Sequence, residues 1–552
     1  MPLMGSLFVG ASGLQTSQNA LNTTAHNLSN LDTTGYVRQQ VLLSTSVYNT
    51  VAYSASSVSN QQVGSGVTYS KIRQVRDIFL DQTYRKESGR SAFYETSYKA
   101  VSSAESLLNE LNDSSFSSGL DNLWTSVQEL AKNPTSATIQ TLLVQRASQF
   151  ISKAQSVYNG LCDYQDNLNN ELMEKIDRVN EIGAQIKTVN DKIREIESAG
   201  IETANDLRDT RNSLLDELSA YADITYTDDV FGNTCVKIEG VDFVTTATHY
   251  DIAVKVDATT GFYIPYWPQC ATVNTDANGV RTVNTDGAEV FNTDVTISSV
   301  TNTDIGSLKS IMYARGDRRA TYADLLDKET YDRDISQSTI MNIQAEFDQL
   351  VHGVVTAINE VMAKASNPDT GYMCNEDGSP MQMFTKITTS AYNWNPVTSK
   401  WEYMEEDPAV TETLYSTSNI TINSNLVKQP TLLSFRLEDG SEDYDTANAL
   451  EDIFEEEKYI LNPNLKTECN FSDYYSNLVS QISNTASVMY SVCSSQEITV
   501  NETDAARDQV MGVSSEEELS YMIKYQNAYN AASRYINVID EMLEHILNTF
   551  GA

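Results

Sequence analysis

Residues 7–28 of the chain read LFVGASGLQTSQNALNTTAHNL. Within this stretch one stripe of mostly apolar residues is spaced alternately by four and three positions: Leu7, Ala11, Leu14, Gln18, Leu21, Ala25 and Leu28. The stretch MIKYQNAYNAASRYINVIDEMLEHILNTF, residues 522–550, repeats that stepping through Met522, Tyr525, Tyr529, Ala532, Ile536, Ile539, Leu543, Ile546 and Phe550. Such spacing places one narrow apolar seam on each helix, as in a coiled coil. The two seams are predicted to pair with each other or with neighbouring copies, which indicates assembly before catalysis.

The composition excludes several classes of function. Hydrophobic residues make up 40% of the 552 residues, so packed domains are expected, and this length favours three or four of them. The net charge of −38 disfavours nucleic-acid binding, because few cations are available to neutralise phosphates. There is no apolar run of about 20 residues, so no membrane partner is expected. The start of the chain lacks the pattern of a cleaved secretory signal.

The periodicity predicts an α+β multidomain fold in which terminal coiled-coil helices and a long helical bundle carry two inserted β-rich modules. Helices are predicted at residues 5–30, 73–130, 139–199, 205–221, 308–365, 446–454, 471–494 and from 514 onward. The predicted units are a terminal core of residues 1–40 and 510–552, a bundle of residues 41–221, 305–365 and 444–509, and β modules at residues 222–304 and 366–443. Helices from both halves of the chain therefore form the bundle.

No catalytic constellation is present in the sequence. Its four histidines have no partner at metal-ligand spacing, and the HExxH, GxSxG, Walker and GxGxxG patterns are absent. Its six cysteines are scattered without a CxxC pair, so free thiols are expected. We therefore expect no catalytic residues, no metal and no cofactor, and we predict that the protein is not an enzyme.

The seamed helix and the turn after it resemble the N-terminal signature of bacterial flagellar rod, hook and hook-associated proteins. The matching positions are Asn27, Leu28, Asn30, Gly35 and Tyr36. The family usually has Asn-Thr-Pro before this glycine, whereas this chain has Asp32-Thr33-Thr34, without the proline that stiffens the turn. The tail resembles the C-terminal signature of the same family at Tyr525, Gln526, Ala528, Tyr529, Asp540, Met542 and Leu543.

Three inner segments resemble the hook-associated members found at the junction between hook and filament. They are GSGVTYSKIRQVRDIFLDQTYR at residues 64–85, NDLRDTRNSLLDELS at 205–219 and IGSLKSIMYARGD at 305–317. The second is the most discriminating, because it is not expected in rod or hook subunits. The β modules show no such resemblance and are predicted from composition alone.

The resemblance implies a structural subunit that polymerises through its terminal helices. Members of this family leave the cell through the flagellar type III export apparatus without a cleaved signal, so an extracellular, flagellar location is expected. The implied partners are further copies in a ring on the hook tip, the hook protein, a second junction protein with the filament above it, and an export chaperone on the C-terminal helix. The expected assembly residues are Leu7, Leu14, Leu21, Asn27, Leu28, Asn30, Gly35, Tyr36, Tyr525, Gln526, Tyr529, Ile536, Ile539, Leu543 and Ile546.

The terminal helices are expected to be disordered in the monomer. Ordering about 30 residues costs about 1–2 kcal/mol each in backbone entropy, and the N-terminal seam offers only about five sizeable apolar side chains at about 1.5–3 kcal/mol each. An intramolecular coiled coil that is already folded in the monomer is the alternative. Gln18 either fixes the register of the seam or faces solvent.

Two other functions compete with the junction subunit. The first is another axial subunit, such as a hook or rod protein. The second is a secreted adhesin whose β modules bind host ligands.

Overall fold

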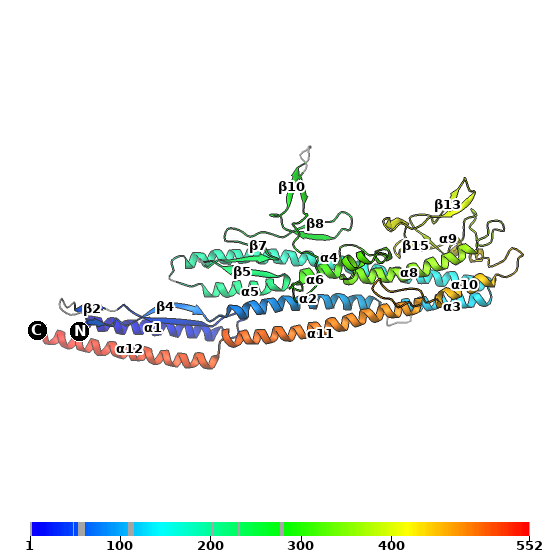
Figure 1. Ribbon diagram of the computed structural model, residues 1–552. Coiled ribbons are helices and arrows are strands. Elements are labelled where there is room, and N and C mark those ends of the chain that lie inside the picture. The colour runs from blue at the N-terminus through cyan, green and yellow to red at the C-terminus, as the bar shows by residue number, and fades with distance from the viewer. Residues whose placement is uncertain are drawn as a thin grey trace.

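The computed structural model describes residues 3–47, 49–52, 61–108, 115–200, 202–229, 232–275 and 281–550. It is an elongated molecule in which the long helices run along the length and the small sheets lie on one side of them (Figure 1). Both ends of the chain lie at the same end of the molecule, on α1 (Leu3–Ser29) and α12 (Ser515–Phe550). The fold is therefore α+β, as the sequence predicts.

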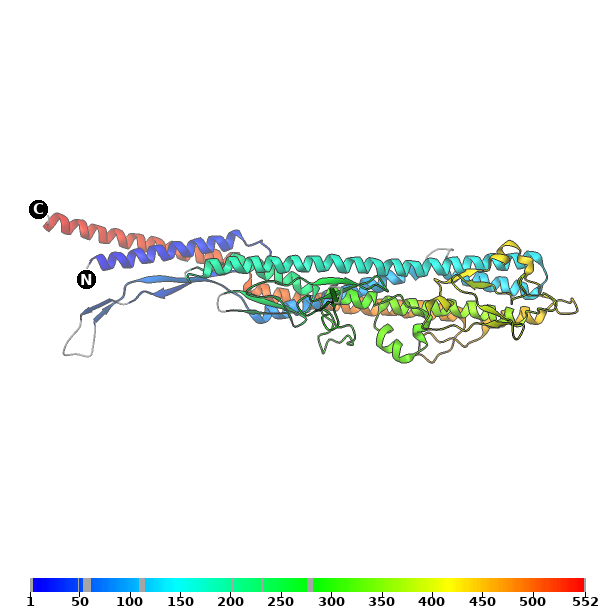
Figure 2. The same cartoon turned by 90° about the horizontal axis from the view of Figure 1, so that it is seen from above.

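An antiparallel ribbon follows α1 and lies beside it. Its strands are β1 (Gln39–Thr45), β2 (Asn49–Ala52), β3 (Gln61–Val63) and β4 (Val67–Gln74). Gln39 pairs with Gln74 and Thr45 with Val67, with a register shift between Leu42 and Leu43. In Figure 2 the β2–β3 end of the ribbon points away from α1 and α12.

The body of the molecule is a bundle of helices from both halves of the chain. They are α2 (Ile78–Leu108), α3 (Phe116–Lys132), α4 (Ala137–Glu197), α5 (Asn205–Tyr221), α6 (Ser307–Arg315), α8 (Thr339–Lys364), α10 (Tyr444–Glu455) and α11 (Phe471–Met511). With 61 residues, α4 is about 90 Å long. Aromatic rings from four helices meet in the core, where the Phe116 ring lies 4.9 Å from both Phe347 and Tyr475 and 5.4 Å from Phe150. This contact joins the two halves of the chain.

Three of the predicted helices are wrong in extent. Instead of one helix over residues 73–130, β4 continues to Gln74, and α2 and α3 follow as separate helices; residues 109–114 lie outside the described residues. The Ser115 hydroxyl begins α3 by accepting a hydrogen bond from the Ser118 N–H. The helix predicted over 308–365 is interrupted because Gly316, at φ +76°, ends α6. The helix predicted over 471–494 continues to Met511.

Short helical segments fill the interruption between α6 and α8 and parts of the second β-rich region. They are a 3₁₀ turn at Tyr322–Leu325, α7 (Lys328–Thr330), a π turn at Tyr331–Ile335, 3₁₀ turns at Thr411–Thr413 and Pro430–Leu432, and α9 (Ser424–Lys428).

The strands after α5 form small antiparallel sheets rather than one large sheet. The first region holds β5 (Ile224–Asp228), β6 (Thr234–Ile238), β7 (Val241–Val244), β8 (Ala253–Val256), β9 (Tyr263–Tyr266), β10 (Thr272–Thr275) and β11 (Arg281–Asn284). The second holds β12 (Phe384–Lys386), β13 (Tyr392–Asn395), β14 (Lys400–Tyr403) and β15 (Ile420–Ile422). Gly183 lets the three-stranded sheet reach α4, because a Cβ at that position would collide with the ring of Phe243.

Candidate assembly interface

The terminal helices approach each other closely at two glycines of α1. A Cβ on Gly10 would lie 2.7 Å from Cγ1 of Ile536, and a Cβ on Gly13 would lie 3.6 Å from Cβ of Ala532. The first distance is shorter than van der Waals contact, so a larger residue at position 10 would push α12 away. The two glycines therefore set the spacing of the helix pair.

The buried side of α1 carries small and polar side chains. Its buried residues include Thr16, Ser17, Ala20, Thr23, Thr24 and Asn27. Leu7, Leu14, Leu21 and Leu28 are half-buried, whereas Ala11, Gln18 and Ala25 of the predicted stripe are exposed in the single chain. The reason is that small side chains let both α12 and the ribbon approach the helix axis, which leucines would prevent. Gln18 faces solvent, as one of the two readings expects.

The seam of α12 lies against α1 along most of its length. Tyr525, Tyr529, Ile536 and Leu543 are half-buried, and Ile539 is only 3% exposed. Two expected assembly residues differ from these, because the Gln526 side chain is exposed and Ile546 is 40% exposed. The paired part of the seam therefore ends before Ile546.

Further apolar side chains lie off the seam and are open to solvent. On α12, Ile523 is 60% exposed, Met542 52% and Leu547 70%, while Phe8 on α1 is 71% exposed. A helix that is apolar on more than one face normally has more than one neighbour. Contiguous exposed apolar surface also marks protein–protein contact sites.

A groove of about 1150 Å³ runs between α1, the ribbon and α12. Its apolar lining comes from Phe8, Val9, Val47, Val67, Tyr69 and Tyr535, and the remaining lining residues are glycines or uncharged polar residues. Charge is scarce along this whole part of the chain: residues 1–70 contain only Asp32 and Arg38 as charged residues, although the net charge of the protein is −38. Copies of the protein can therefore approach each other here with little electrostatic repulsion.

Asn27 connects α1 to the ribbon. Its amide Nδ2 donates to the Gln39 carbonyl at 2.9 Å, and its Oδ1 accepts from the Gln39 N–H at 3.0 Å. The Tyr36 hydroxyl donates to the same Oδ1 at 2.8 Å. Asn27 is 1% exposed, so this side chain satisfies backbone groups that would otherwise be buried without partners.

The turn after α1 brings the other signature residues against α5. The Asn30 side chain donates to the His26 carbonyl at 3.0 Å and closes the end of the helix. Gly35 has φ +78°, a conformation that favours glycine, and a Cβ there would lie 2.5 Å from the Ser213 hydroxyl and force that side chain to turn away. The Tyr36 ring packs edge-on against His26 with ring centroids 5.6 Å apart. Burial, with the charges of nearby carboxylates, raises the pKa of Tyr36 above its usual range.

The acidic face of α5 holds the ribbon and the turn in place. The Val37 N–H donates to Asp209 at 3.3 Å, and the Gln74 amide donates to the other oxygen of Asp209 at 2.6 Å. The Gln39 side chain donates to Asp206 at 2.9 Å. Burial raises the pKa of Asp209 to about 7, although the Val37 N–H and the Arg76 charge oppose the rise. Residues 205–219, whose sequence is the most discriminating, thus form the surface on which the terminal unit is placed.

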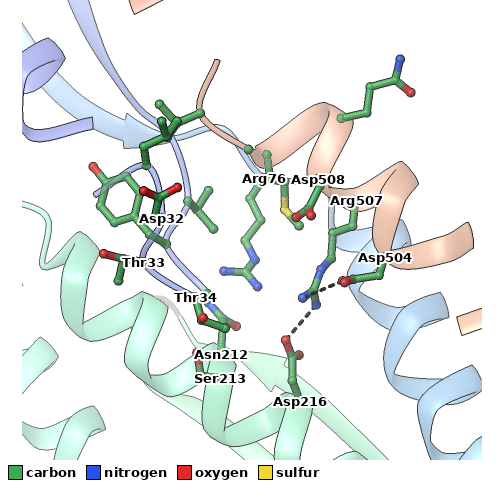
Figure 3. Close-up of a pocket in the computed structure, with 18 of the residues that line it drawn as sticks. Asp32, Thr33, Thr34, Arg76, Asn212, Ser213, Asp216, Asp504, Arg507 and Asp508 are labelled. Atoms are coloured by element: carbon green, nitrogen blue, oxygen red, sulfur yellow. Dashed lines mark hydrogen bonds and ion pairs between the residues drawn. The ribbon is translucent and has the colours of Figure 1, made fainter. Parts of the chain in front are cut away.

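A cavity of about 590 Å³ lies where the turn, α5 and the end of α11 meet (Figure 3). The Arg507 guanidinium donates to Asp216 of α5 at 2.8 Å and contacts Asp504 at 3.2 Å. Its guanidinium also lies 4.0 Å from the ring centroid of Tyr84 on α2. Arg507 therefore links the last turns of α11 to both α5 and α2. No sequence motif predicted this link.

Arg38 connects the turn to α12. Its side chain contacts Glu518 at 2.8 Å and Glu517 at 2.9 Å, and its backbone N–H donates to the Met511 carbonyl at 2.9 Å. Glu518 is 2% exposed, so this ion pair is largely protected from water. Arg38, one of the two charged residues among residues 1–70, therefore forms its ion pairs within the molecule.

The described residues contain no group of three or more His, Cys, Asp or Glu side chains that could hold a metal ion. Among the same residues, every helix is too short or too polar to cross a membrane.

Three family models match successive parts of the chain. "Flagella basal body rod protein" matches residues 7–36, "Flagellar hook-associated protein FlgK helical domain" matches residues 101–372, and "Flagellar basal body rod FlgEFG protein C-terminal" matches residues 509–549. Flagellar hook-associated protein 1 of Bacillus subtilis is 27% identical over 559 residues, which cover 99% of each chain. The chain is therefore similar to the flagellar hook-associated proteins along its whole length.

Other hook-associated proteins agree with this assignment. Flagellar hook-associated protein 1 of Escherichia coli is 22% identical over 583 residues, covering 99% of this chain and 100% of that protein. The structure of the flagellar hook junction protein FlgK from Burkholderia pseudomallei matches with a TM-score of 0.53 at 11% identity, over 78% of this chain and 100% of that one, and supports the fold. These matches favour a hook-associated junction subunit over a rod protein, a hook protein or an adhesin. The comparisons thus indicate a structural, hook-associated protein of the bacterial flagellum.

Proposed function

We propose that the protein polymerises through its terminal helices into a ring on the hook tip. The observation that carries this proposal is the apolar surface left open on the helix pair, which includes Phe8, Ile523, Met542 and Leu547. The uncharged groove beside it supports the proposal, because a neighbouring copy of this acidic protein meets little repulsion there.

The proposed assembly residues take two roles. The seam residues Leu7, Leu14, Leu21, Leu28, Tyr525, Tyr529, Ile536, Ile539 and Leu543 join the two helices of one subunit and extend to neighbours, where Gln526 and Ile546 are already open to solvent. Asn27, Asn30, Gly35 and Tyr36 orient the helix pair on the body through the ribbon and α5.

The same surface suggests the remaining partners. In this proposal the hook protein lies below the ring, and a second junction protein with the filament lies above it. Before export through the type III apparatus, a chaperone covers the apolar surface of α12. We further propose a non-catalytic role, with residues 1–40 and 510–552 as the assembly unit, residues 41–221, 305–365 and 444–509 as the bundle, and residues 222–304 and 366–443 as modules facing outward.

We also propose that the helix pair is only marginally stable in the single subunit. The face of α1 toward α12 holds Gly10, Gly13 and Ala20, which bury little apolar area and contribute little to stability. Limited proteolysis tests this: cleavage should remove about 30–40 residues from each end of the monomer, because nicking concentrates at weakly packed termini. Equal protease resistance of the ends in monomer and assembly would contradict it.

The test of the proposed function is a charge placed on the open surface. Val538 and Met542 are 46% and 52% exposed, so the double variant Val538→Asp/Met542→Asp should leave the thermal unfolding of the monomer within about 1 kcal/mol of the parent. In cells it should abolish filaments while hooks remain, and flagellin should appear in the medium. The matched control is Val397→Asp, at a turn residue that is 92% exposed and distant from α12. Normal filaments from the double variant, with the protein present on hooks, would contradict the proposal.

A further inference from the structure

A second cavity, of about 570 Å³, lies between the end of β4, the first turns of α2 and α5, and cations line it. Six basic residues line it against three acidic ones: Lys71, Arg73, Arg76, Arg85, Arg208 and Arg211 against Asp81, Glu197 and Asp228. Four of these cations are paired with carboxylates, so within the described residues the unpaired positive charge at the cavity is that of Lys71 and Arg73; the pairs are Arg76–Asp81, Arg85–Asp216, Arg208–Glu197 and Arg211–Asp228.

Two of these arginines are buried and have an N–H group without a hydrogen-bond partner. Arg85 is 3% exposed; its Nε donates to Asp216 at 2.6 Å and its guanidinium lies 4.5 Å from the Tyr226 ring centroid, but its Nη1 has no acceptor. Arg211 is 2% exposed; its Nη1 donates to Asn190 and to the Gly232 carbonyl, but its Nε has no acceptor.

Arg76 adds a third donor from a different part of the chain. Its Nε donates to Asp81 at 2.5 Å, while its Nη1 is buried without a hydrogen bond and lies 3.7 Å from Asp209. Burial lowers the pKa of Arg211 to about 10; the charge of Asp228 opposes this fall, and the positive charges of Arg208 and Arg76 add to it. These guanidinium groups therefore lie close enough to repel one another, and buried charged donors without acceptors are costly.

We propose that this cavity binds one small phosphate-class oxyanion. Arg76, Arg85 and Arg211 approach from the segment before α2, from α2 itself and from α5, and donors from three directions suit an anion with several oxygen atoms. Arginine is the preferred partner of phosphate because its planar group offers several N–H donors. Lys71 and Arg73 are exposed at the mouth, form no ion pair within the described residues, and attract the anion.

The bound anion would connect β4, α2 and α5 at the place where the ribbon joins the body. The volume of the cavity lies within the range of small-molecule sites, about 300–1,000 Å³.

The experiment titrates the purified full-length monomer with inorganic phosphate by isothermal calorimetry, with chloride and acetate at equal ionic strength as comparison anions. We expect saturable binding of one phosphate per chain, and slower hydrogen exchange over residues 71–78 and 205–215 when phosphate is present. A phosphate monoester in a separate arm distinguishes free phosphate from the phosphate group of a small molecule. Absence of saturable phosphate binding, or equal binding of acetate, would overturn the proposal.

Variants locate the binding at this cavity. Lys71→Gln/Arg73→Gln removes two exposed charges at the mouth and should weaken phosphate binding roughly threefold to tenfold, as expected for two solvent-exposed charge contacts. Lys237→Gln/Lys400→Gln removes the same charge elsewhere and should leave the affinity unchanged. Arg211→Lys keeps the charge but loses the fork of donors, and should abolish binding if it folds. Equal weakening in both double variants would assign the effect to net charge and would overturn the site.

Discussion

At the scale of single residues, the Asn27 side chain makes the backbone hydrogen bonds to Gln39 that a neighbouring strand would otherwise make. It offers Gln39 both a donor and an acceptor at the edge of the ribbon, and it also accepts from Tyr36. The side chain of a helix residue thereby fixes where the following ribbon begins. This explains in physical terms why asparagine, rather than another polar residue, suits position 27.

Replacing Asn27 should loosen the ribbon from the helix. Asn27→Ala leaves the buried N–H and C=O groups of Gln39 without partners, at a cost of about 2–4 kcal/mol. Hydrogen exchange over residues 37–45 should accelerate accordingly. Tyr36→Phe, which removes one of the three hydrogen bonds, is the matched control and should cost about 1 kcal/mol. Equal exchange rates in the parent and in Asn27→Ala would refute this account.

Asp209 should make the junction sensitive to pH. Its carboxyl keeps its proton up to about pH 7 in the folded protein but loses it near pH 3.9 in the unfolded chain, because burial disfavours the charge. This group therefore favours folding fully below about pH 3.9, and that contribution, at most about 4 kcal/mol, is lost as the pH rises to about 7.

The measurement compares the unfolding of the parent and of Asp209→Asn between pH 4 and pH 8. Between pH 4 and pH 8 the free energy of unfolding should fall less for Asp209→Asn than for the parent, because asparagine has no proton to release. Parallel profiles for the parent and Asp209→Asn would show that Asp209 is ionised in the folded state.

At the scale of elements, the glycine face of α1 determines how the terminal helices pair. Gly10→Leu should separate α1 from α12, because even a Cβ at this position meets Ile536 at 2.7 Å. Gly5→Leu is the control, because nothing lies within 4 Å of a Cβ there, and it should stabilise α1 by about 0.5–1 kcal/mol through helix propensity. Hydrogen exchange in α12 of the monomer reports both outcomes. Faster exchange in both variants, or in neither, would contradict the role assigned to Gly10.

Much of the helical framework could be predicted from the sequence, because apolar periodicity reports burial directly. The helix predicted at residues 205–221 is α5, and the one predicted at 139–199 is α4 within two residues at each end. The limits that were missed depend on backbone features that periodicity does not report. Gly316 ends α6 through its positive φ, and Gln74 belongs to β4 because it pairs with Gln39 across the ribbon.

The candidate interface was predictable only in part for a related reason. A stripe of large apolar residues is visible in a sequence, whereas a face of Gly10, Gly13 and Ala20 is not, since small residues bury well only when a partner approaches closely. The contacts of Asp209 and Arg507 join segments 172 and 291 residues apart, which no local pattern reveals. The resemblance of residues 205–219 to hook-associated proteins was the one signal that pointed to α5.

At the scale of the whole molecule, net charge opposes assembly and salt should assist it. Each copy carries a net charge of −38, and the Debye length falls from about 10 Å at 0.1 M salt to about 3 Å at 1 M. Self-association of the purified protein, followed by light scattering, should therefore increase with salt concentration. Val538→Asp/Met542→Asp should remain monomeric throughout. Dissociation on adding salt would show that ion pairs, rather than apolar contacts, hold the copies together.

The hairpin of β13 and β14 turns at residues 396–399, far from α1 and α12 along the molecule (Figure 1). The Val397 side chain at this turn is almost fully exposed. A short epitope or a fluorophore inserted there would be displayed at a site remote from every contact that orients the helix pair. Flagella carrying such a tag should remain motile, and the junction could then be visualised in living bacteria.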